Sequence, residues 1–418
     1  MLLGHRPPAL TDAIAQQLAL GWEIGPQTVL AGEVAALVAE LTGHERVAFC
    51  NTGSEAVLAA IRMARTVSGK DRIAVFGGSY HGMFDEVIAR PLPDGRAVPA
   101  APGIPRSATD QLLFLEYGSP SAFAELERQA SSLAAVLVEP VQSRRPELQP
   151  WDFLLELRQV TERLGLALVF DEVITGFRAH PGGVQGMLGI QADLATYGKV
   201  AGGGLPLGLV AGRSAYMDAL DGGTWDYGDD SYPVAGVTMF AGTFVRHPLT
   251  LAAAKATLAT LRDAGASLQE ELNAKTAKLA DAHNRECRER QAPVDVASFS
   301  SFFYINLRSA SPSASLLFWL LREKGVHVWD QRPCFLTTAH TEADLDTVVR
   351  AFAESLEELQ AAGLLEGGTE AKPAPDSAEA ATPPVPGARL GRTPEGEAAW
   401  FVADPERPGK YLQVAADV

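Results

Sequence analysis

Cysteine, positive charge and long apolar runs are all scarce in this 418-residue sequence. Its three cysteines, Cys50, Cys287 and Cys334, form no CxxC pair and no metal-ligand spacing, which favours a reducing compartment. With 35 basic against 51 acidic residues, the net charge of -16 argues against non-specific binding to nucleic acid or to an anionic membrane surface. No stretch approaches ~18 apolar residues, and residues 1–17 lack the pattern of a signal peptide. We therefore expect a soluble, cytoplasmic protein without a transmembrane helix.

Two motif classes are missing as well. The sequence contains no HExxH and no GxxxxGK[ST], and its cysteines and histidines are scattered. Neither a metal-dependent nor a nucleotide-dependent activity is supported by these patterns.

What the chain does have is a high apolar content, 47%, in short runs that are rich in Val, Ile, Phe and Leu. Helix-period stretches such as 54–66 and 150–165 lie between these runs. This alternation predicts an α/β fold with a mainly parallel sheet covered by helices on both faces. Each run ends in a polar or glycine-bearing turn, and ligands gather at the carboxyl ends of parallel strands. The predicted strands are 46–50, 72–76, 134–138, 166–170 and 192–197.

The character of the chain changes near residue 266. From there the patterns predict a smaller α+β domain, then a linker over 366–388 that is rich in Pro, Ala, Gly and acidic residues, and a tail over 389–418. The tail regains aromatic residues, so we expect it to dock on a surface. The elements predicted for the smaller domain are an exposed helix over 267–290, strands over 297–308 and 326–339, and helices over 312–325 and 341–363, the last with Thr341 as N-cap.

Two of the turns are suited to a phosphate and to a flat ring. "NTGSEA" places Gly53 and Ser54 at the start of a helix, where backbone N–H groups and the helix dipole attract anions, although an ordinary N-cap is the alternative. "GGSYHG" places Tyr80 and His81 in a glycine-flanked turn, where a ring could stack on Tyr80. The alternative there is a buried structural Tyr–His pair.

Two further turns supply a carboxylate and an amine. Asp171 ends a hydrophobic strand, where it could pair with a protonated pyridine nitrogen while Val173 contacts the other face of the ring. Lys199 precedes a glycine run that lets the backbone approach a bulky partner, and its amine could bond covalently to an aldehyde. A solvated turn and a surface loop are the respective alternatives. The four features together, in this order, predict a pocket for pyridoxal 5′-phosphate (PLP).

The motifs that carry these residues resemble those of the class III aminotransferases, which have the fold of the fold-type I PLP enzymes. The resemblance covers residues 1–360, and its branch is that of glutamate-1-semialdehyde aminomutase. It implies a large PLP-binding domain over 25–266, a small domain over 267–365, and a segment over 1–24 that belongs to the small domain. The matching motifs are "NTGSEA", "YHG", "EPVQ", "FDEVITGFR", "YGKVAGGGLPLG" and "GTF".

The resemblance also implies roles for single residues. Lys199 would hold the cofactor covalently, Asp171 would pair with the ring nitrogen, and Gly53 and Ser54 would bind the phosphate. Tyr80 and Val173 would lie on opposite faces of the ring. Glu139 and His81 are expected near the cofactor without an assigned role. Thr243 would reach the phosphate of the neighbouring subunit, which implies a homodimer.

Two departures from the family pattern stand out. The chain begins at Met1 in the middle of the pattern, which suggests a trimmed N-terminal portion and leaves part of the substrate pocket undefined. His247–Pro248 stands where the wider family often has Asn–Pro. For His247 we favour a structural role in the turn over contact with substrate.

Within its branch the sequence is similar to aminotransferase modules of hybrid polyketide–nonribosomal peptide synthases, through residues 21–43 and 335–346 and through the tail. This implies transfer of an amino group from glutamate or glutamine to a β-ketoacyl thioester on an acyl carrier protein. One alternative is an aminomutase that acts on a free amino aldehyde. Another is an inactive docking or dimerisation domain of a synthase, which the presence of Lys199 and Asp171 disfavours.

Overall fold

The computed structural model describes residues 1–23, 28–93, 95–223, 228, 230, 236–309 and 311–365, and in the tail 389–392, 398–403 and 411–414. Two units can be distinguished, Met1–Gly367 and Gly368–Val418. The predicted boundary at 24/25 and the predicted linker over 366–388 lie outside the described residues. The division into a large and a small domain at 266/267 stays a prediction.

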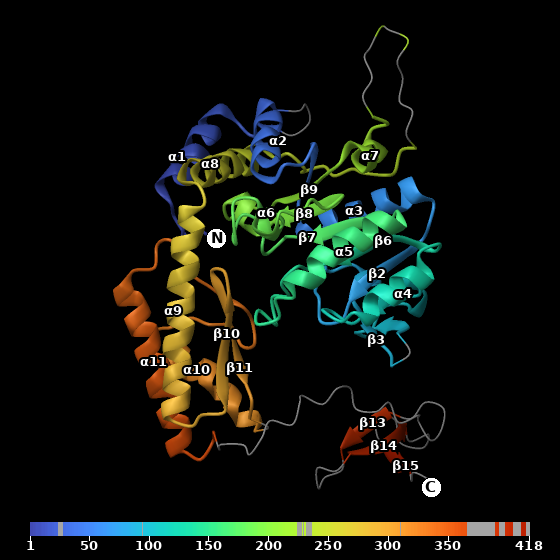
Figure 1. The fold of residues 1–418 in the computed structure, drawn as a ribbon. Helices are drawn as coiled ribbons and strands as arrows, with labels where there is room; N and C mark the ends of the chain where they lie inside the picture. The colour runs from blue at the N-terminus through green and yellow to red at the C-terminus, as the bar shows by residue number, and fades with distance from the viewer. Residues whose placement is uncertain are drawn as a thin grey trace. The chain divides into compact units, whose positions relative to one another are not determined.

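A seven-stranded sheet forms the centre of the first unit (Figure 1). Six strands run in the same direction, and only β9 is antiparallel to its two neighbours. The carboxyl ends of the six therefore meet at one edge. In spatial order the strands are β1 (Arg46–Cys50), β9 (Gly208–Gly212), β8 (Leu194–Gly198), β7 (Ala167–Asp171), β6 (Leu133–Val138), β2 (Arg72–Phe76) and β5 (Leu112–Leu115).

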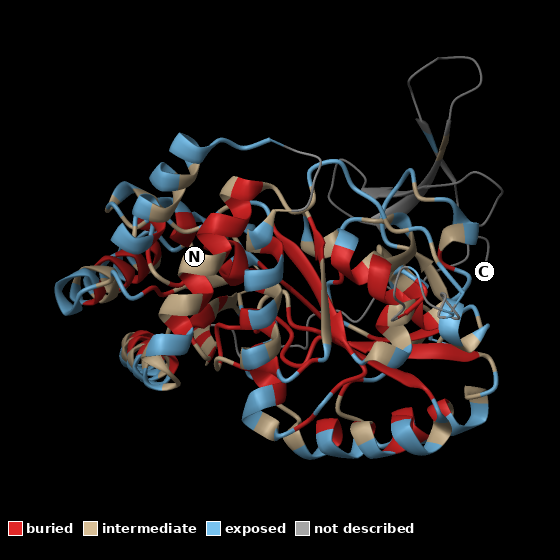
Figure 2. Ribbon diagram, turned by 90° about the horizontal axis from the view of Figure 1, so that it is seen from above, coloured by how far each residue is buried: buried red, intermediate tan, exposed pale blue. Residues whose placement is uncertain are grey.

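Both faces of this sheet are buried, as Figure 2 shows by the red strands between helices. Because side chains alternate along a strand, Ile73 and Val75 of β2 pack into one cluster with α3 (Gly53–Ser68), while Ala74 and Phe76 pack into another. The second cluster contains α2 (Val29–Thr42), α4 (Ser121–Gln129), α5 (Trp151–Leu164) and α8 (Pro248–Ala264). The predicted fold class, a mainly parallel sheet with helices on both faces, is confirmed.

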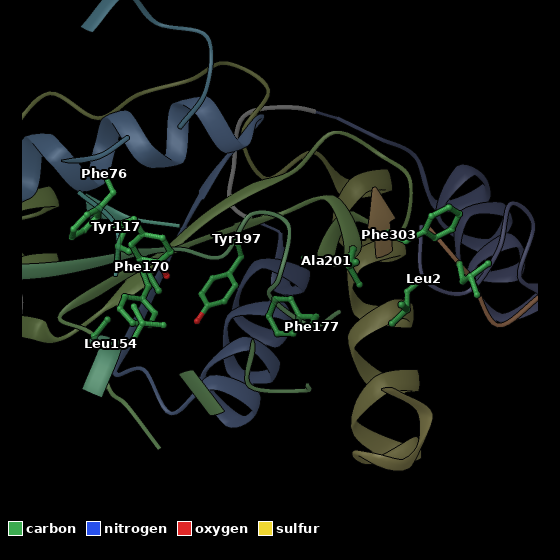
Figure 3. Packing of buried hydrophobic residues seen from close by; sticks show 14 of the residues in the cluster. Leu2, Phe76, Tyr117, Leu154, Phe170, Phe177, Tyr197, Ala201 and Phe303 are labelled. Atoms are coloured by element: carbon green, nitrogen blue, oxygen red, sulfur yellow. The ribbon is translucent and has the colours of Figure 1, made fainter. Parts of the chain in front are cut away.

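Figure 3 shows part of this second cluster, including the side chains of Phe170, Phe177 and Tyr197. Phe177 and Tyr197 are fully buried, with ring centroids 5.1 Å apart, and the Tyr197 hydroxyl accepts a hydrogen bond from Gln185. This packing holds the segment that follows β7, which contains Phe177 and Gln185, against Tyr197 of β8. Shorter elements of the unit are α1 (Pro8–Leu20), α6 (Gly183–Leu188), α7 (Ser214–Met217), β3 (Ala89–Pro91) and β4 (Ala97–Pro99).

A second, antiparallel sheet lies beside three helices further along the chain. Its strands are β10 (Val294–Phe299), β11 (Phe302–Leu307) and β12 (Cys334–Phe335), and the helices are α9 (Ser267–Glu289), α10 (Leu316–Glu323) and α11 (Glu342–Ala361). Thr341 is the N-cap of α11 and forms a capping box with Asp344, as predicted.

Three local predictions in this part are wrong. The single strand predicted over 297–308 is a hairpin, because Ser300 adopts a left-handed φ of 53° and turns the chain. Of the strand predicted over 326–339, only the two residues of β12 form a strand. The Val328 carbonyl accepts a hydrogen bond from Arg322 instead of from a neighbouring strand, and Pro333 has no N–H to donate. One face of α9, predicted to be exposed, is buried through Leu272, Leu279 and His283, among others.

The second unit contains an antiparallel sheet in the tail, with strands β13 (Arg389–Arg392), β14 (Ala398–Ala403) and β15 (Tyr411–Val414). In its register Arg389 is opposite Phe401 and Ala403 is opposite Tyr411. Docking of the tail stays a prediction. In the described part of the chain, no helix is both long enough and apolar enough to cross a membrane.

Candidate functional site

A cavity of about 670 Å³ lies at the carboxyl ends of β1, β2, β6, β7 and β8. Strand-end turns that are far apart in the sequence meet there because the five strands are parallel in space. All predicted site residues except Thr243 line this cavity: Gly53, Ser54, Tyr80, His81, Glu139, Asp171, Val173 and Lys199.

Lys199 follows β8 directly and has a left-handed backbone, with φ at 40°. Such a conformation is uncommon for a non-glycine residue, and it is held by the short 3-10 turn Lys199–Gly202. The side chain is exposed, and it extends into the cavity rather than away from the protein. Desolvation by the walls lowers the pKa of the Lys199 amine, against the opposing effects of Asp171 and Glu139. A lowered pKa increases the fraction of free amine, the form that attacks an aldehyde.

The side chain of Asp171, at the end of β7, has a defined orientation. Its Oδ2 lies 2.8 Å from Nδ1 of His81, and its Oδ1 accepts hydrogen bonds from the Val173 N–H and the Thr196 hydroxyl, both at 3.2 Å. Both members of the His81–Asp171 pair are buried. A carboxylate so fixed is suited to a cationic ring nitrogen. Among the described residues the His81 Nε2 atom has no hydrogen-bond partner, although it is buried.

Glu139 follows β6 and connects two loops at the cavity. Its Oε2 accepts the Tyr80 N–H at 3.2 Å, and its Oε1 accepts the Ser143 N–H at 3.1 Å. Burial, followed by the charge of Asp171, raises the pKa of Glu139 to about 7. Through these hydrogen bonds Glu139 positions the Tyr80 turn.

The loop after Glu139 gives the Tyr80 turn further support. Gln142 donates to the Gly77 carbonyl and to the Ser79 hydroxyl, each at 2.9 Å, and Arg145 also donates to the Gly77 carbonyl, at 3.0 Å. The Tyr80 side chain nevertheless remains 53% exposed at the cavity wall. The ring thus has a free face on which a planar group can stack.

The N-terminus of α3 forms another wall of the cavity. The Thr52 hydroxyl accepts the Glu55 N–H at 3.2 Å, and the Glu55 carboxylate accepts the Asn51 N–H at 2.6 Å. Gly53 and Ser54 then provide first-turn N–H groups that have no partner within the helix. A Cβ atom on Gly53 would lie 2.7 Å from Cγ1 of Val173, so only glycine permits this close approach.

Thr243 and His247 lie outside the cavity lining. Thr243 is exposed, in the turn that precedes α8. His247 is the N-cap of α8, and its Nδ1 accepts the Leu249 N–H at 3.2 Å. The structural role favoured for His247 thus has a physical basis in this hydrogen bond.

Several cavity residues were not singled out from the sequence, among them Asn51, Arg178 and Phe335. Arg178 was visible as the last residue of "FDEVITGFR", the motif that begins at the end of β7 and contains Asp171. Phe335 could not be found, because its place at the cavity depends on how the second sheet packs against the first.

These features fit PLP. The cavity combines an amine, a fixed carboxylate, an aromatic ring with a free face, unpaired helix N–H groups and a buried imidazole nitrogen that lacks a partner. The chemical groups of the cofactor, an aldehyde, a pyridine nitrogen, a flat ring and a phosphate, each have a counterpart among them.

Comparisons with known proteins agree with this geometry. The family model described as aminotransferase class-III matches residues 1–354. A glutamate-1-semialdehyde 2,1-aminomutase of Archaeoglobus fulgidus is 34% identical over 373 residues, covering 85% of this chain and 86% of that protein.

Two solved structures are similar over most of the chain. One is a transaminase with PLP bound, with a TM-score of 0.76 and 26% identity over 87% of this chain and 85% of that one. The other is a β-phenylalanine aminotransferase from Variovorax paradoxus, with a TM-score of 0.73 and 29% identity, covering 88% of this chain and 82% of that one.

Proposed function

The chain belongs to the class III aminotransferases, which use PLP, and we propose that it transfers an amino group from an amino-acid donor to a β-ketoacyl thioester on an acyl carrier protein. The observation that carries the proposal is that Lys199 and Asp171 line one cavity with Tyr80 and the N-terminus of α3. When bound, PLP supplies an electron sink for the carbanion that forms at the substrate carbon.

Each residue has a task in this proposal. Lys199 would hold the cofactor through its aldehyde group, and the Lys199 amine would move a proton at the reacting carbon as general base and then as acid. Its lowered pKa favours the base form. Asp171 keeps the ring nitrogen protonated, and His81 orients Asp171 through the 2.8 Å contact.

Further residues would hold the cofactor. Tyr80 and Val173 enclose the ring, and the N–H groups of Gly53 and Ser54 bind the phosphate. Glu139 holds Tyr80 in place through the hydrogen bond it accepts from the Tyr80 N–H. Thr243 contacts the phosphate of a second copy in a homodimer, which accounts for a position outside its own cavity.

The thioester substrate is the finer part of the proposal. It rests on the resemblance to aminotransferase modules of hybrid synthases that we infer from the sequence of residues 21–43, 335–346 and the tail. A structural relative that acts on β-phenylalanine is consistent with amine formation at a β-carbon.

The test is incubation of the PLP-loaded protein with a β-ketoacyl carrier protein and glutamate or glutamine. We expect the acyl chain to gain the mass that corresponds to replacement of the ketone oxygen by an amine. An unchanged acyl mass, with an enzyme that does accept amino groups from the donor, would rule out this substrate.

An intramolecular aminomutase is the second candidate, favoured by the 34% identity to a protein of that name. It would use the same cavity residues, but it would convert a free amino aldehyde without an external donor. Requirement for a donor in the same assay distinguishes the two functions.

A further inference from the structure

Arg178 is a buried cation at the cavity wall without an acidic partner. Its exposed fraction is 3%, and it forms no ion pair with any residue that the structure describes. Burying a charge without a counter-ion is costly, so such a residue is retained where an anion completes its environment. Burial lowers the pKa of Arg178 to about 10, which still leaves the guanidinium charged at neutral pH.

The groups that contact this guanidinium are all neutral. Nη1 donates to the Ser301 hydroxyl at 2.8 Å and to the Leu336 carbonyl at 3.4 Å, and Cζ lies 4.7 Å from the centre of the Phe335 ring. Nε and Nη2 form no hydrogen bond with the described residues. These two nitrogens are the edge of a guanidinium that binds a carboxylate in bidentate fashion.

The other charged groups of the cavity do not compensate Arg178. Asp171 is paired with His81, and Glu139 accepts two backbone N–H groups. Lys199 is repelled by Arg178, whose charge is among the causes that lower the Lys199 pKa. Since none of the described residues supplies an anion to Arg178, the geometry leaves this place to a ligand.

We propose that Arg178 binds the carboxylate of the amino-acid donor, an assignment that rests on the proposed aminotransferase function. The N-terminus of α3 is already suited to the phosphate of the cofactor, so the remaining anion is that of the substrate. A carboxylate fixed by two parallel hydrogen bonds orients the donor amine relative to Lys199.

The same residue links donor binding to the second sheet. Ser301 and Ser300 form the turn between β10 and β11, and the Ser300 hydroxyl donates to the Arg178 carbonyl at 3.2 Å. Arg178, which lies in the loop after β7, is therefore held against this turn of the second sheet. Removing the Ser301 hydroxyl should weaken carboxylate binding less than removing the charge.

The test compares Arg178→Gln, Arg178→Lys and Ser301→Ala with the unaltered holoenzyme, and uses Arg262→Gln on the surface of α8 as a control. Three quantities are measured: PLP loading by absorbance, binding of glutarate by calorimetry, and the KM and kcat for L-glutamate in the donor half-reaction. Glutarate has the carboxylates of the donor but no amine.

We expect Arg178→Gln to load PLP normally, to weaken glutarate binding about 10- to 100-fold and to raise KM by a similar factor. Arg178→Lys keeps the charge without the bidentate edge and should lose less, and Ser301→Ala should lose least. Arg262→Gln should match the unaltered enzyme.

Two results would overturn the assignment. Loss of PLP loading in both Arg178 variants would place Arg178 on the cofactor phosphate, and unchanged glutarate binding in them would show that another group holds the carboxylate. If glutarate binding depends on Arg178 while L-glutamate transfers no amine, the carboxylate site stands and the proposed donor chemistry fails.

Discussion

At the scale of single residues, burial sets the protonation states of the cavity. The pKa of Lys199 is lowered, which favours the free amine, and the pKa of Glu139 is raised, which favours the protonated carboxyl group. Both shifts have desolvation as their largest cause, which disfavours the charged form of either group. Desolvation in the cavity therefore favours the uncharged form of both groups.

Glu139 gives a prediction about stability. The pKa of Glu139 in the folded protein is about 7, above its ordinary value of 4.5. The contribution of Glu139 to the stability of the folded protein is therefore fully present below pH 4.5 and is lost as the pH rises through 7. Glu139→Gln cannot ionise and should not show this loss. In the PLP-free protein the unfolding free energy of the wild type, relative to Glu139→Gln, should fall by about 3 kcal/mol between pH 4.5 and pH 8.

Urea unfolding of both proteins across this pH range measures the difference. A pH-independent difference would mean that Glu139 ionises in the folded protein as it does in water.

At the scale of elements, close approach of backbones builds the site. A Cβ atom on Gly208 of β9 would lie 2.0 Å from the Thr52 carbonyl oxygen, so the turn before α3 rests directly on β9. The position of the N–H groups that we propose for phosphate binding therefore depends on a strand that contributes no predicted site residue of its own.

Gly208→Ala should destabilise the protein and displace the N-terminus of α3. The expected loss is at least ~2 kcal/mol in unfolding free energy, with weaker PLP binding. Gly32→Ala is the matched control, because its Cβ would meet nothing within 4 Å in helix α2, and it should stabilise by about 0.5–1 kcal/mol. Thermal unfolding and PLP titration of both variants check this; equal PLP affinity in Gly208→Ala would contradict the account.

Prediction from sequence was successful for strands that a single local pattern identifies. The strands that end at Cys50, Phe76 and Asp171 are marked by apolar runs with polar ends, and their shared direction brings the cavity residues together. The hairpin at Ser300 escaped because a left-handed serine is not visible in an apolar pattern. The buried face of α9 escaped because its many charges obscure the buried stripe.

The role of Arg178 could not be derived from sequence for a related reason. Its significance lies in the absence of an acidic partner, which depends on the packing of Ser301 and Leu336 around it. Burial without an ion pair is a property of three-dimensional contacts.

At the scale of the whole molecule, we predict that a second copy of the chain brings Thr243 to the phosphate site. Thr243 is exposed and does not line the cavity of its own subunit. If it acts on the neighbouring subunit, each site of the proposed homodimer contains Lys199 from one copy and Thr243 from the other.

Mixed dimers test this arrangement. Lys199→Ala and Thr243→Arg proteins should each be inactive alone, the second because an arginine side chain fills the space of the phosphate. A dimer with one subunit of each kind contains one site with both changes and one site with neither, so mixing after mild unfolding should restore up to about half of the activity per dimer. No recovery in verified mixed dimers would place Thr243 at the site of its own subunit.

The covalent attachment of the cofactor tests the central claim most directly. The PLP-loaded protein is reduced with borohydride, digested and analysed by mass spectrometry, with Lys199→Ala treated in parallel. We predict that the reduced cofactor is found on Lys199 and that no peptide of the variant carries it. Attachment to another lysine, or none in the unaltered protein, would contradict the account.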